Sequence, residues 1–558
     1  MAKAPSPKKQ AKARKQPEPA PPTSSPREPR FRDELVPATA LGKRSLLGIL
    51  ALALLLRSLN LLGMLPVLVD ESIYLRWAEI IDNQGQWFIS LLDGKQPLHP
   101  WVLAVQRMVW DGDPLLGGRF LSAIAGLLST IGIFAIGRRV SSELGGIIAA
   151  FLYAIFPLAM LYDRLAYTEG FVNACGIFLA LTSIWIFAER PSLRSAWIPG
   201  AAMAIAMLTK QTLLLLWFFP ALAALLYRRE RASLAPLAFI YGCGVAAVVF
   251  CAVMTPEAPM LSTHDAVLHH TGFFASPEEL LADPFGPFAI NIAKLGGYLT
   301  TYLTWPGLLA CIAAIGYLAW RKSLAAWAIL SLTFAPWLVQ LFLLKLMYPT
   351  RYPYPHFWPL LVVMAMAAVD LWDRSPAQRR KPILAGALAL VALPMLYRDF
   401  GLLFNTREHL HERDQYFFTR SVGHVGYGIA EAIDFLEGEA QRNGGFVLLT
   451  DPIWGPPSDV MAPYLNGKFG IRVFECWWTQ LSGTHPIMPF GAAELIKSHY
   501  ERTQSGRIDF RQVDRVFYIT DTEYNPPEAV HVRQPTAQLA KRFPKPENDQ
   551  SIDVYRLK

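Results

Sequence analysis

The sequence predicts a polytopic α-helical membrane protein with a small α/β domain at its C-terminal end. Its mean hydropathy is +0.27, and only 17% of its 558 residues are charged, which is unusual for a soluble chain of this length. The apolar residues form blocks of about 17 to 25 residues, long enough for a helix to cross a bilayer. The net charge of +8 comes mainly from the N-terminal tail and from short loops between the blocks. This distribution follows membrane topology and argues against nucleic-acid binding.

The first 44 residues predict a disordered basic tail. They are rich in Pro, Lys, Arg and Ser and have almost no apolar residue before Phe31, so they cannot bury enough surface to fold. The tail is too rich in proline for the start of a signal peptide, and no small-residue cleavage site follows the first apolar block. We therefore expect this block to be retained as the first membrane span.

The apolar blocks number about eleven when the two short ones on either side of Lys210 are counted separately. With a cytoplasmic N-terminus, this count places every dense basic cluster on the cytoplasmic side, as the positive-inside rule requires. The chain after residue 400 then lies outside the cytoplasm. The blocks are 45–66, 114–136, 145–161, 170–188, 197–209, 213–227, 234–254, 300–320, 324–346, 357–372 and 383–398.

The C-terminal residues 401–558 predict an extracytoplasmic α/β domain. A helical pattern runs from Ile429 to Leu436, and strand-like runs follow at Phe446–Thr450 and Val516–Thr520 between loops rich in Pro and Gly. Residues 45–400 form the membrane domain. Within it, we expect the first outer loop, residues 66–113, to carry two amphipathic helices that lie in the membrane interface.

An acidic pair, Asp70 and Glu71, directly follows the first apolar block. A carboxylate in this partly dehydrated setting can have a raised pKa, which suits it to accept a proton from a hydroxyl. Adjacent acids are also common as a plain stop at a helix end, so position alone leaves both interpretations open. Other polar residues fall on the same predicted outer face. They are Tyr74, His99, Asp163, Arg164, Glu169, Tyr352 and His356.

Three lone cations, Lys95, Lys210 and Arg351, lie at the outer ends of predicted spans. Cations placed where a phosphate leaves would stabilise the charge that develops on it, although each could instead reach toward lipid headgroups. Arg57 is harder to explain, because it lies inside the first span, where an unpaired charge is costly. It needs a partner, either a carboxylate or a lipid phosphate.

Several familiar site patterns are absent from the sequence. It contains no P-loop, dinucleotide fingerprint, serine nucleophile elbow or CxxC pair. His264, His269 and His270 lack the i, i+4 spacing of a helical metal-binding pair. We therefore do not expect these three histidines to form a metal site.

A set of short motifs resembles the GT-C glycosyltransferases, above all the protein O-mannosyltransferases and the lipid A aminoarabinose transferases. The motifs span roughly residues 45–400, and their order, spacing and common side of the membrane make the set fairly specific. Relatives often have Asp at the position of Glu169. The similar segments are Val69–Tyr74, Gly85–Trp87, Asp93–Leu98, Gly118–Ser122, Arg164–Glu169, Thr209-Lys210 and Arg351-Tyr352.

The resemblance implies a GT-C fold and an inverting glycosyltransferase at the extracytoplasmic face of the plasma (inner) membrane. A polyprenyl-phosphate-linked sugar would be the donor, and the acceptor would be a protein, a lipid or a glycan. No cofactor would be required, and assistance by a divalent cation stays open. Asp70 would be the general base, supported by Glu71, Asp163 and Glu169. The phosphate would contact Lys95, Lys210, Arg351, Arg57 and Arg164, and the sugar or acceptor would contact Tyr74, His99, Tyr352 and His356.

A flippase or other transporter of lipid-linked sugars is the main alternative. Transporters carry paired polar groups near the middle of the membrane and broken helices that arise from internal repeats. Here only Arg57 is clearly intramembrane, and the two halves of the chain show no repeat. A third interpretation, a scaffold that merely presents the α/β domain, leaves the acid-rich first loop unexplained.

Overall fold

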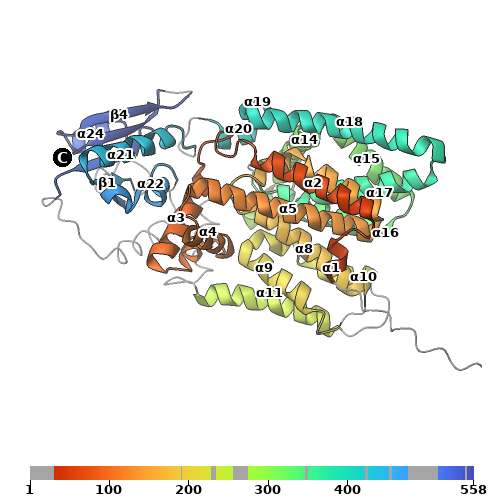
Figure 1. Ribbon diagram of the computed structural model, residues 1–558. Coiled ribbons are helices and arrows are strands. Elements are labelled where there is room, and N and C mark those ends of the chain that lie inside the picture. The colour runs from red at the N-terminus through yellow and green to blue at the C-terminus, as the bar shows by residue number, and fades with distance from the viewer. Residues whose placement is uncertain are drawn as a thin grey trace, which may run out of the picture.

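The computed structural model has two parts, a bundle of long helices and a mixed α/β domain (Figure 1). Helices α3 (Val69–Gln84) and α4 (Leu98–Val109) lie between the two parts, so the segment 66–113, predicted to be the first outer loop, connects them. The structure describes residues 31–189, 192–227, 234–254, 274–345, 350–420, 425–451, 455–475, 513–546 and 549–558.

Each apolar block predicted from the sequence holds helix in the structure. Among the described residues, six helices are long and apolar enough to cross a membrane, and the pair α14–α15, bent by 110°, would make a seventh. The count of about eleven spans and the side of each loop stay predictions. The helices of the bundle are α1 (Phe31–Leu35), α2 (Ala40–Ser58), α5 (Pro114–Val140), α6 (Glu143–Ala154), α7 (Pro157–Tyr162), α8 (Glu169–Ala188), α9 (Trp197–Thr209), η2 (Gln211–Leu216), α10 (Phe218–Tyr227), α11 (Ala235–Met254), α13 (Pro277–Ala282), α14 (Gly286–Tyr302), α15 (Thr304–Trp320), α16 (Leu324–Leu343), η3 (Tyr354–His356), α17 (Trp358–Arg374) and α18 (Ala377–Phe404).

The two short blocks on either side of Lys210 form separate helices, as the charge pattern predicts. Helix α9 ends at Thr209, and Lys210 has an extended backbone with φ −163° and ψ 137°. This conformation interrupts the helical hydrogen bonds before η2 begins. Lys210 is therefore presented at a helix end and not on the flank of a continuous helix.

The C-terminal domain is built on a five-stranded sheet with the strand order β2-β1-β3-β5-β4. Strands β1, β2 and β3 are parallel, whereas β5 is antiparallel to both β3 and β4. The helix and both strands predicted from the sequence are present as α21, β1 and β3. The elements that follow α18 are α19 (Thr406–His409), α20 (Glu412–Phe418), α21 (Ile429–Asn443), β1 (Val447–Thr450), α22 (Ser458–Leu465), η4 (Lys468–Gly470), β2 (Arg472–Glu475), β3 (Val516–Asp521), α24 (Pro527–Arg533), β4 (Gln538–Pro544) and β5 (Ser551–Arg556). The short helix η1 (Ile89–Asp93) lies between α3 and α4.

The C-terminal domain packs directly on the start of α3. The backbone N–H of Gly426 donates to the carbonyl oxygen of Val67 at 2.8 Å, and Leu68 and Val425 form an antiparallel bridge. Val67 and Leu75 belong to the same buried apolar cluster as the inner face of the domain. The first outer loop is therefore held between the bundle and the domain.

One prediction differs from the structure, and a second stays open. The disordered tail was expected to reach residue 44, yet α1 and the start of α2 fall within it, because Phe31 packs edge-on against Trp185 with ring centroids 5.3 Å apart. The position of α3 in the membrane interface stays a prediction, but its polar residues do not face water, since Arg76 and Glu79 are only 3% and 1% exposed. The C-terminal domain covers them, and Asn466 donates to Glu79 at 3.3 Å.

Candidate active site

Asp70 lies in the first turn of α3, between two cations from distant parts of the chain. Its Oδ2 forms an ion pair with the guanidinium of Arg351, and its Oδ1 lies 3.5 Å from Nζ of Lys95. The side chain of Asp70 keeps 14% of its surface exposed, and those of Lys95 and Arg351 keep 34% and 24%. All three groups are therefore within reach of a molecule from outside.

The two cations set the acidity of Asp70. Burial alone would raise the pKa of Asp70, but the charges of Arg351 and Lys95 outweigh it and hold that pKa well below its ordinary value. The raised pKa expected from the sequence is therefore wrong for this arrangement, because that expectation counted burial without the cations. Asp70 is ionised in this arrangement. It becomes a strong proton acceptor only when Lys95 and Arg351 pair with another anion, because its pKa then rises.

A second ion pair, between Glu169 and Lys210, lies next to the first. Nζ of Lys210 is 2.5 Å from Oε1 of Glu169, whose side chain is only 3% exposed. The ring of Tyr352 connects the two pairs, since the cationic centres of Arg351 and Lys210 lie 5.1 Å and 6.0 Å from its centroid. Nη2 of Arg351 also donates to the Tyr352 hydroxyl at 3.2 Å. We call Asp70, Lys95, Glu169, Lys210, Arg351 and Tyr352 the Asp70 cluster.

Two aromatic rings lie beside the ammonium group of Lys95. Its Nζ lies 5.4 Å from the ring centroid of Tyr74 and 5.3 Å from that of Trp77, within the range of cation–π attraction. The imidazole of His99 packs edge-on against Tyr74, with centroids 4.7 Å apart. Burial lowers the pKa of His99 to about 3, so this ring is neutral at physiological pH. Tyr74 and His99 thus lie beside the cluster.

Glu71, the neighbour of Asp70, has a different set of partners. Its Oε1 accepts from Nε of Arg119 and from the backbone N–H of Ala166, both at 2.8 Å. Its Oε2 accepts from Nη2 of Arg119 at 2.7 Å and from the N–H of Leu68 at 3.1 Å. The side chain is fully buried. Glu71 therefore fastens the start of α3 to α5 and to the segment before α8.

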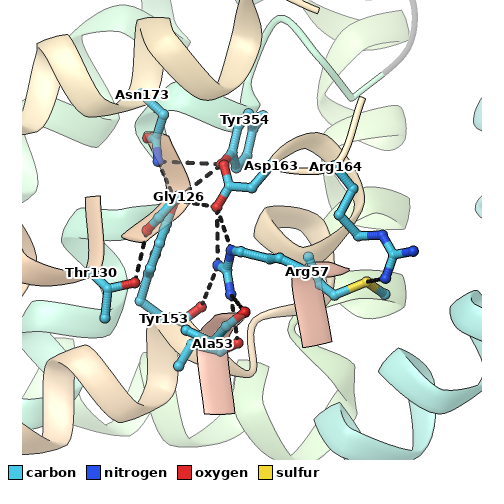
Figure 2. A network of polar contacts seen from close by, with 11 residues as sticks. Ala53, Arg57, Gly126, Thr130, Tyr153, Asp163, Arg164, Asn173 and Tyr354 are labelled. Carbon is cyan, nitrogen blue, oxygen red and sulfur yellow. Dashed lines mark hydrogen bonds and ion pairs between the residues drawn. The ribbon is translucent and has the colours of Figure 1, made fainter. Parts of the chain in front are cut away.

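Arg57 and Asp163 form a separate, fully buried network (Figure 2). Nε of Arg57 donates to Oδ2 of Asp163 at 3.0 Å, and Nη1 donates to the carbonyl oxygen of Ala154 at 3.0 Å. The hydroxyls of Tyr153 and Tyr354 donate to Asp163 at 3.0 Å and 2.6 Å. Of the two partners expected for Arg57, the structure shows the carboxylate.

Two comparisons with known proteins match the chain. A family model described as dolichyl-phosphate-mannose-protein mannosyltransferase matches residues 94–255, which include Lys95, Glu169 and Lys210. The crystal structure of ArnT from Cupriavidus metallidurans bound to undecaprenyl phosphate has a TM-score of 0.56 and 13% sequence identity, covering 93% of this chain and 99% of ArnT. The chain has the GT-C fold. The resemblance expected from the motifs is thereby confirmed.

The apo structure of the same ArnT agrees with this GT-C assignment. It has a TM-score of 0.57 and 15% identity, and the alignment covers 92% of this chain and 97% of that one. A search of the curated protein sequences finds no significant match. At identities this low, the structural similarity establishes the shared GT-C fold alone. The reaction must be argued from the site.

The GT-C bundle does not bring every expected residue to the Asp70 cluster. The predicted phosphate contacts of Arg57 and Arg164 differ from the structure, because Arg57 is neutralised by Asp163 and Arg164 donates to the carbonyl oxygens of Leu56 and Leu59 at the end of α2. The catalytic role expected for Asp163 and the sugar contact expected for His356 are likewise not supported. Asp163 is engaged in the Arg57 network, and His356 is 2% exposed within the bundle.

Two residues of the first loop were missed as members of the site. Asp93 lies 3.3 Å from Nζ of Lys95, and Oε1 of Gln96 accepts from the backbone N–H of Gln211 at 3.2 Å, beside Lys210. Both residues lie inside the Asp93–Leu98 motif, so their place in that motif could have marked them as candidate site residues. Within the part of the chain that the structure describes, no group of three His, Cys, Asp or Glu side chains could hold a metal ion. His264, His269 and His270 lie outside that part.

The partners of Glu71 lead to a stability prediction. Glu71→Ala leaves Arg119 buried without its countercharge, which typically costs about 3–5 kcal/mol. We expect a clearly lower midpoint of thermal unfolding for the purified variant, followed by tryptophan fluorescence. Asp70→Asn is the matched control, since its partners are partly exposed and its midpoint should stay near that of the wild type. Equal midpoints for the two variants would contradict a structural role of Glu71.

Proposed function

We propose that this protein is an inverting glycosyltransferase that moves a sugar from a polyprenyl-phosphate donor to an acceptor hydroxyl. The observation that carries the proposal is the partly exposed carboxylate of Asp70 between Lys95 and Arg351. Transfer from a phosphate-linked sugar needs a proton acceptor beside cations that hold the leaving phosphate. The ArnT structure with undecaprenyl phosphate, which shares the GT-C fold, and the match to the mannosyltransferase family model support the same reaction class.

In the proposed reaction Asp70 takes the proton of the acceptor hydroxyl. The acceptor oxygen forms a bond to the anomeric carbon while the bond between that carbon and the phosphate oxygen breaks. The leaving lipid phosphate gains one negative charge, which Lys95 and Arg351 stabilise where it develops. Lys210, held by Glu169, adds a third cation near the same place. The step balances without a further reactant, and the configuration at the anomeric carbon inverts.

Donor binding and base strength are coupled in this arrangement. In the free protein Lys95 and Arg351 are paired with Asp70 and keep its pKa low. A phosphate that binds these cations competes with Asp70 for them, so their effect on Asp70 weakens and its pKa rises toward the value that burial favours. Asp70 thus becomes an effective base only when the donor is in place.

The reaction is proposed to take place at the extracytoplasmic face of the plasma membrane. All basic clusters between the apolar blocks fall on the opposite side when the N-terminus is cytoplasmic. The first outer loop and the C-terminal domain then share the outer face, and these two parts pack on one another. An acceptor hydroxyl on an envelope protein, lipid or glycan would approach from that side.

The test is turnover of defined donors by purified protein in nanodiscs. A panel of polyprenyl-phosphate hexoses and pentoses is supplied, and the release of free polyprenyl phosphate is measured with and without candidate acceptors. We expect release with at least one donor, by transfer or by slow hydrolysis. If no donor turns over and the same protein moves the lipid-linked sugars between leaflets of liposomes, the transporter alternative replaces the proposal.

A further inference from the structure

The segment that carries Arg351 and Tyr352 has little regular structure of its own. Helix α16 ends at Leu343, and α17 starts only at Trp358. Residues 350–353 form a turn before the single-turn helix η3. Within the described residues 350–353 no helix fixes the direction in which Arg351 points, so contacts made by the segment must do so. Gln340 and Trp337 of α16 donate to the carbonyl oxygens of Tyr352 and Pro353 at 3.1 Å and 3.4 Å. Buried acids hold the two ends, Thr350 and Tyr354.

The first end is held by Asp414, a fully buried residue of α20. Its Oδ1 accepts from the backbone N–H of Thr350 at 3.0 Å, and its Oδ2 accepts from the Thr350 hydroxyl at 2.8 Å. The hydroxyl of Tyr302 also donates to Oδ2. Two charge-assisted bonds to one residue fix both its position and its orientation. Thr350 directly precedes Arg351.

The second end is held by Asp163 through Tyr354 (Figure 2). The Tyr354 hydroxyl donates to Oδ1 of Asp163 at 2.6 Å and also lies 3.2 Å from the hydroxyl of Tyr153. Arg57 neutralises Asp163 from the other side. Gly126 makes room for the pair, because a Cβ there would lie 2.5 Å from Oδ2 of Asp163.

We infer that Asp414 and Asp163 are positioning residues that hold the 350–354 segment at both ends and so present Arg351 to the donor phosphate. The inference rests on the proposed function and extends it to two acids outside the Asp70 cluster. Burying two carboxylates costs free energy unless each is well satisfied by donors. Both acids accept hydrogen bonds from the same short segment, at Thr350 and Tyr354. Asp414 and Asp163 therefore act on Arg351 without touching substrate.

The test measures binding of undecaprenyl phosphate to purified protein in nanodiscs, which does not depend on turnover. Thr350→Val and Tyr354→Phe each remove one hydroxyl that bonds to an acid and keep the shape of the side chain. We expect each to weaken binding about tenfold. Tyr317→Phe is the matched control, because Tyr317 donates to Asp370 at a distance from the cluster and its loss should leave binding unchanged.

The decisive comparison repeats both changes in an Arg351→Ala background. If the segment acts through Arg351, Thr350→Val and Tyr354→Phe should change binding there by less than about twofold. Full tenfold losses in that background, or wild-type affinity in the single variants, would overturn the inference. Wild-type protein that binds the lipid phosphate but never turns over a donor would contradict the proposed function alone. Wild-type protein that does not bind it would overturn both.

Discussion

Replacing Asp70 with Asn is expected to lower the rate constant of sugar transfer about 10²–10⁴-fold, the range supplied by a positioned general base. Asn keeps the shape of the side chain but cannot take the acceptor's proton. It also no longer competes with the donor phosphate for Lys95 and Arg351, which pair with Asp70 in the free protein. We therefore expect kcat to fall while KM for the donor stays equal or decreases. Initial rates over a range of donor concentrations measure both constants.

Asp93→Asn is the control for this experiment. Asp93 also pairs with Lys95, at 3.3 Å, so its removal changes the charge near the phosphate without removing the proposed base. We expect kcat of Asp93→Asn to stay within a few fold of the wild type. A similar loss in both variants would mean that the charge balance around Lys95, and not a base, limits the rate. Full activity of Asp70→Asn would move the role of base to Glu169.

Replacing Arg351 with Ala is expected to have the second largest effect. Removing one preorganised group that stabilises developing charge typically costs 10²–10³-fold in kcat. Unlike Asp70→Asn, this change should also raise KM for the donor, because the phosphate loses a ligand. Arg351→Lys should recover only part of the loss, since an ammonium cannot make the planar, two-point contact of a guanidinium.

The Arg351→Ala variant also has a predicted pH signature. Arg351 helps to hold the pKa of Asp70 below its ordinary value, so its removal raises that pKa. The base is lost as the pH falls through the pKa of Asp70, and the acid limb of the kcat/KM profile reports this pKa in the free enzyme. The limb should therefore move to higher pH in Arg351→Ala. An unchanged limb would show that Asp70 is not the group being titrated.

The helical bundle and the first outer loop could be predicted because their signals are local. Apolar blocks of membrane-spanning length gave helices at every expected place, and the extended backbone at Lys210 separates two of them as the charge pattern indicated. The cations Lys95, Lys210 and Arg351 were chosen as lone charges at the outer ends of spans. They do meet at Asp70 and Glu169. Lys210 directly follows the end of α9, whereas Lys95 reaches Asp70 from the loop between η1 and α4.

The roles of neighbouring acids could not be read from the sequence. Asp70 and Glu71 are adjacent, but successive residues of a helix point about 100° apart, so one joins the cluster and the other pairs with Arg119. The low pKa of Asp70 depends on Arg351, which lies 281 positions further along the chain. Asp414 holds Thr350 from a short helix after the last predicted span, and nothing in its local pattern marks it.

The configuration of the transferred sugar tests the central claim most directly. A polyprenyl-phosphate sugar of defined anomeric configuration is supplied with an acceptor that supports turnover, and the product is analysed by NMR. Direct attack by an acceptor activated by Asp70 predicts a product of inverted configuration. Retained configuration would contradict the account, because it requires two successive displacements and would make a carboxylate the nucleophile and not the base.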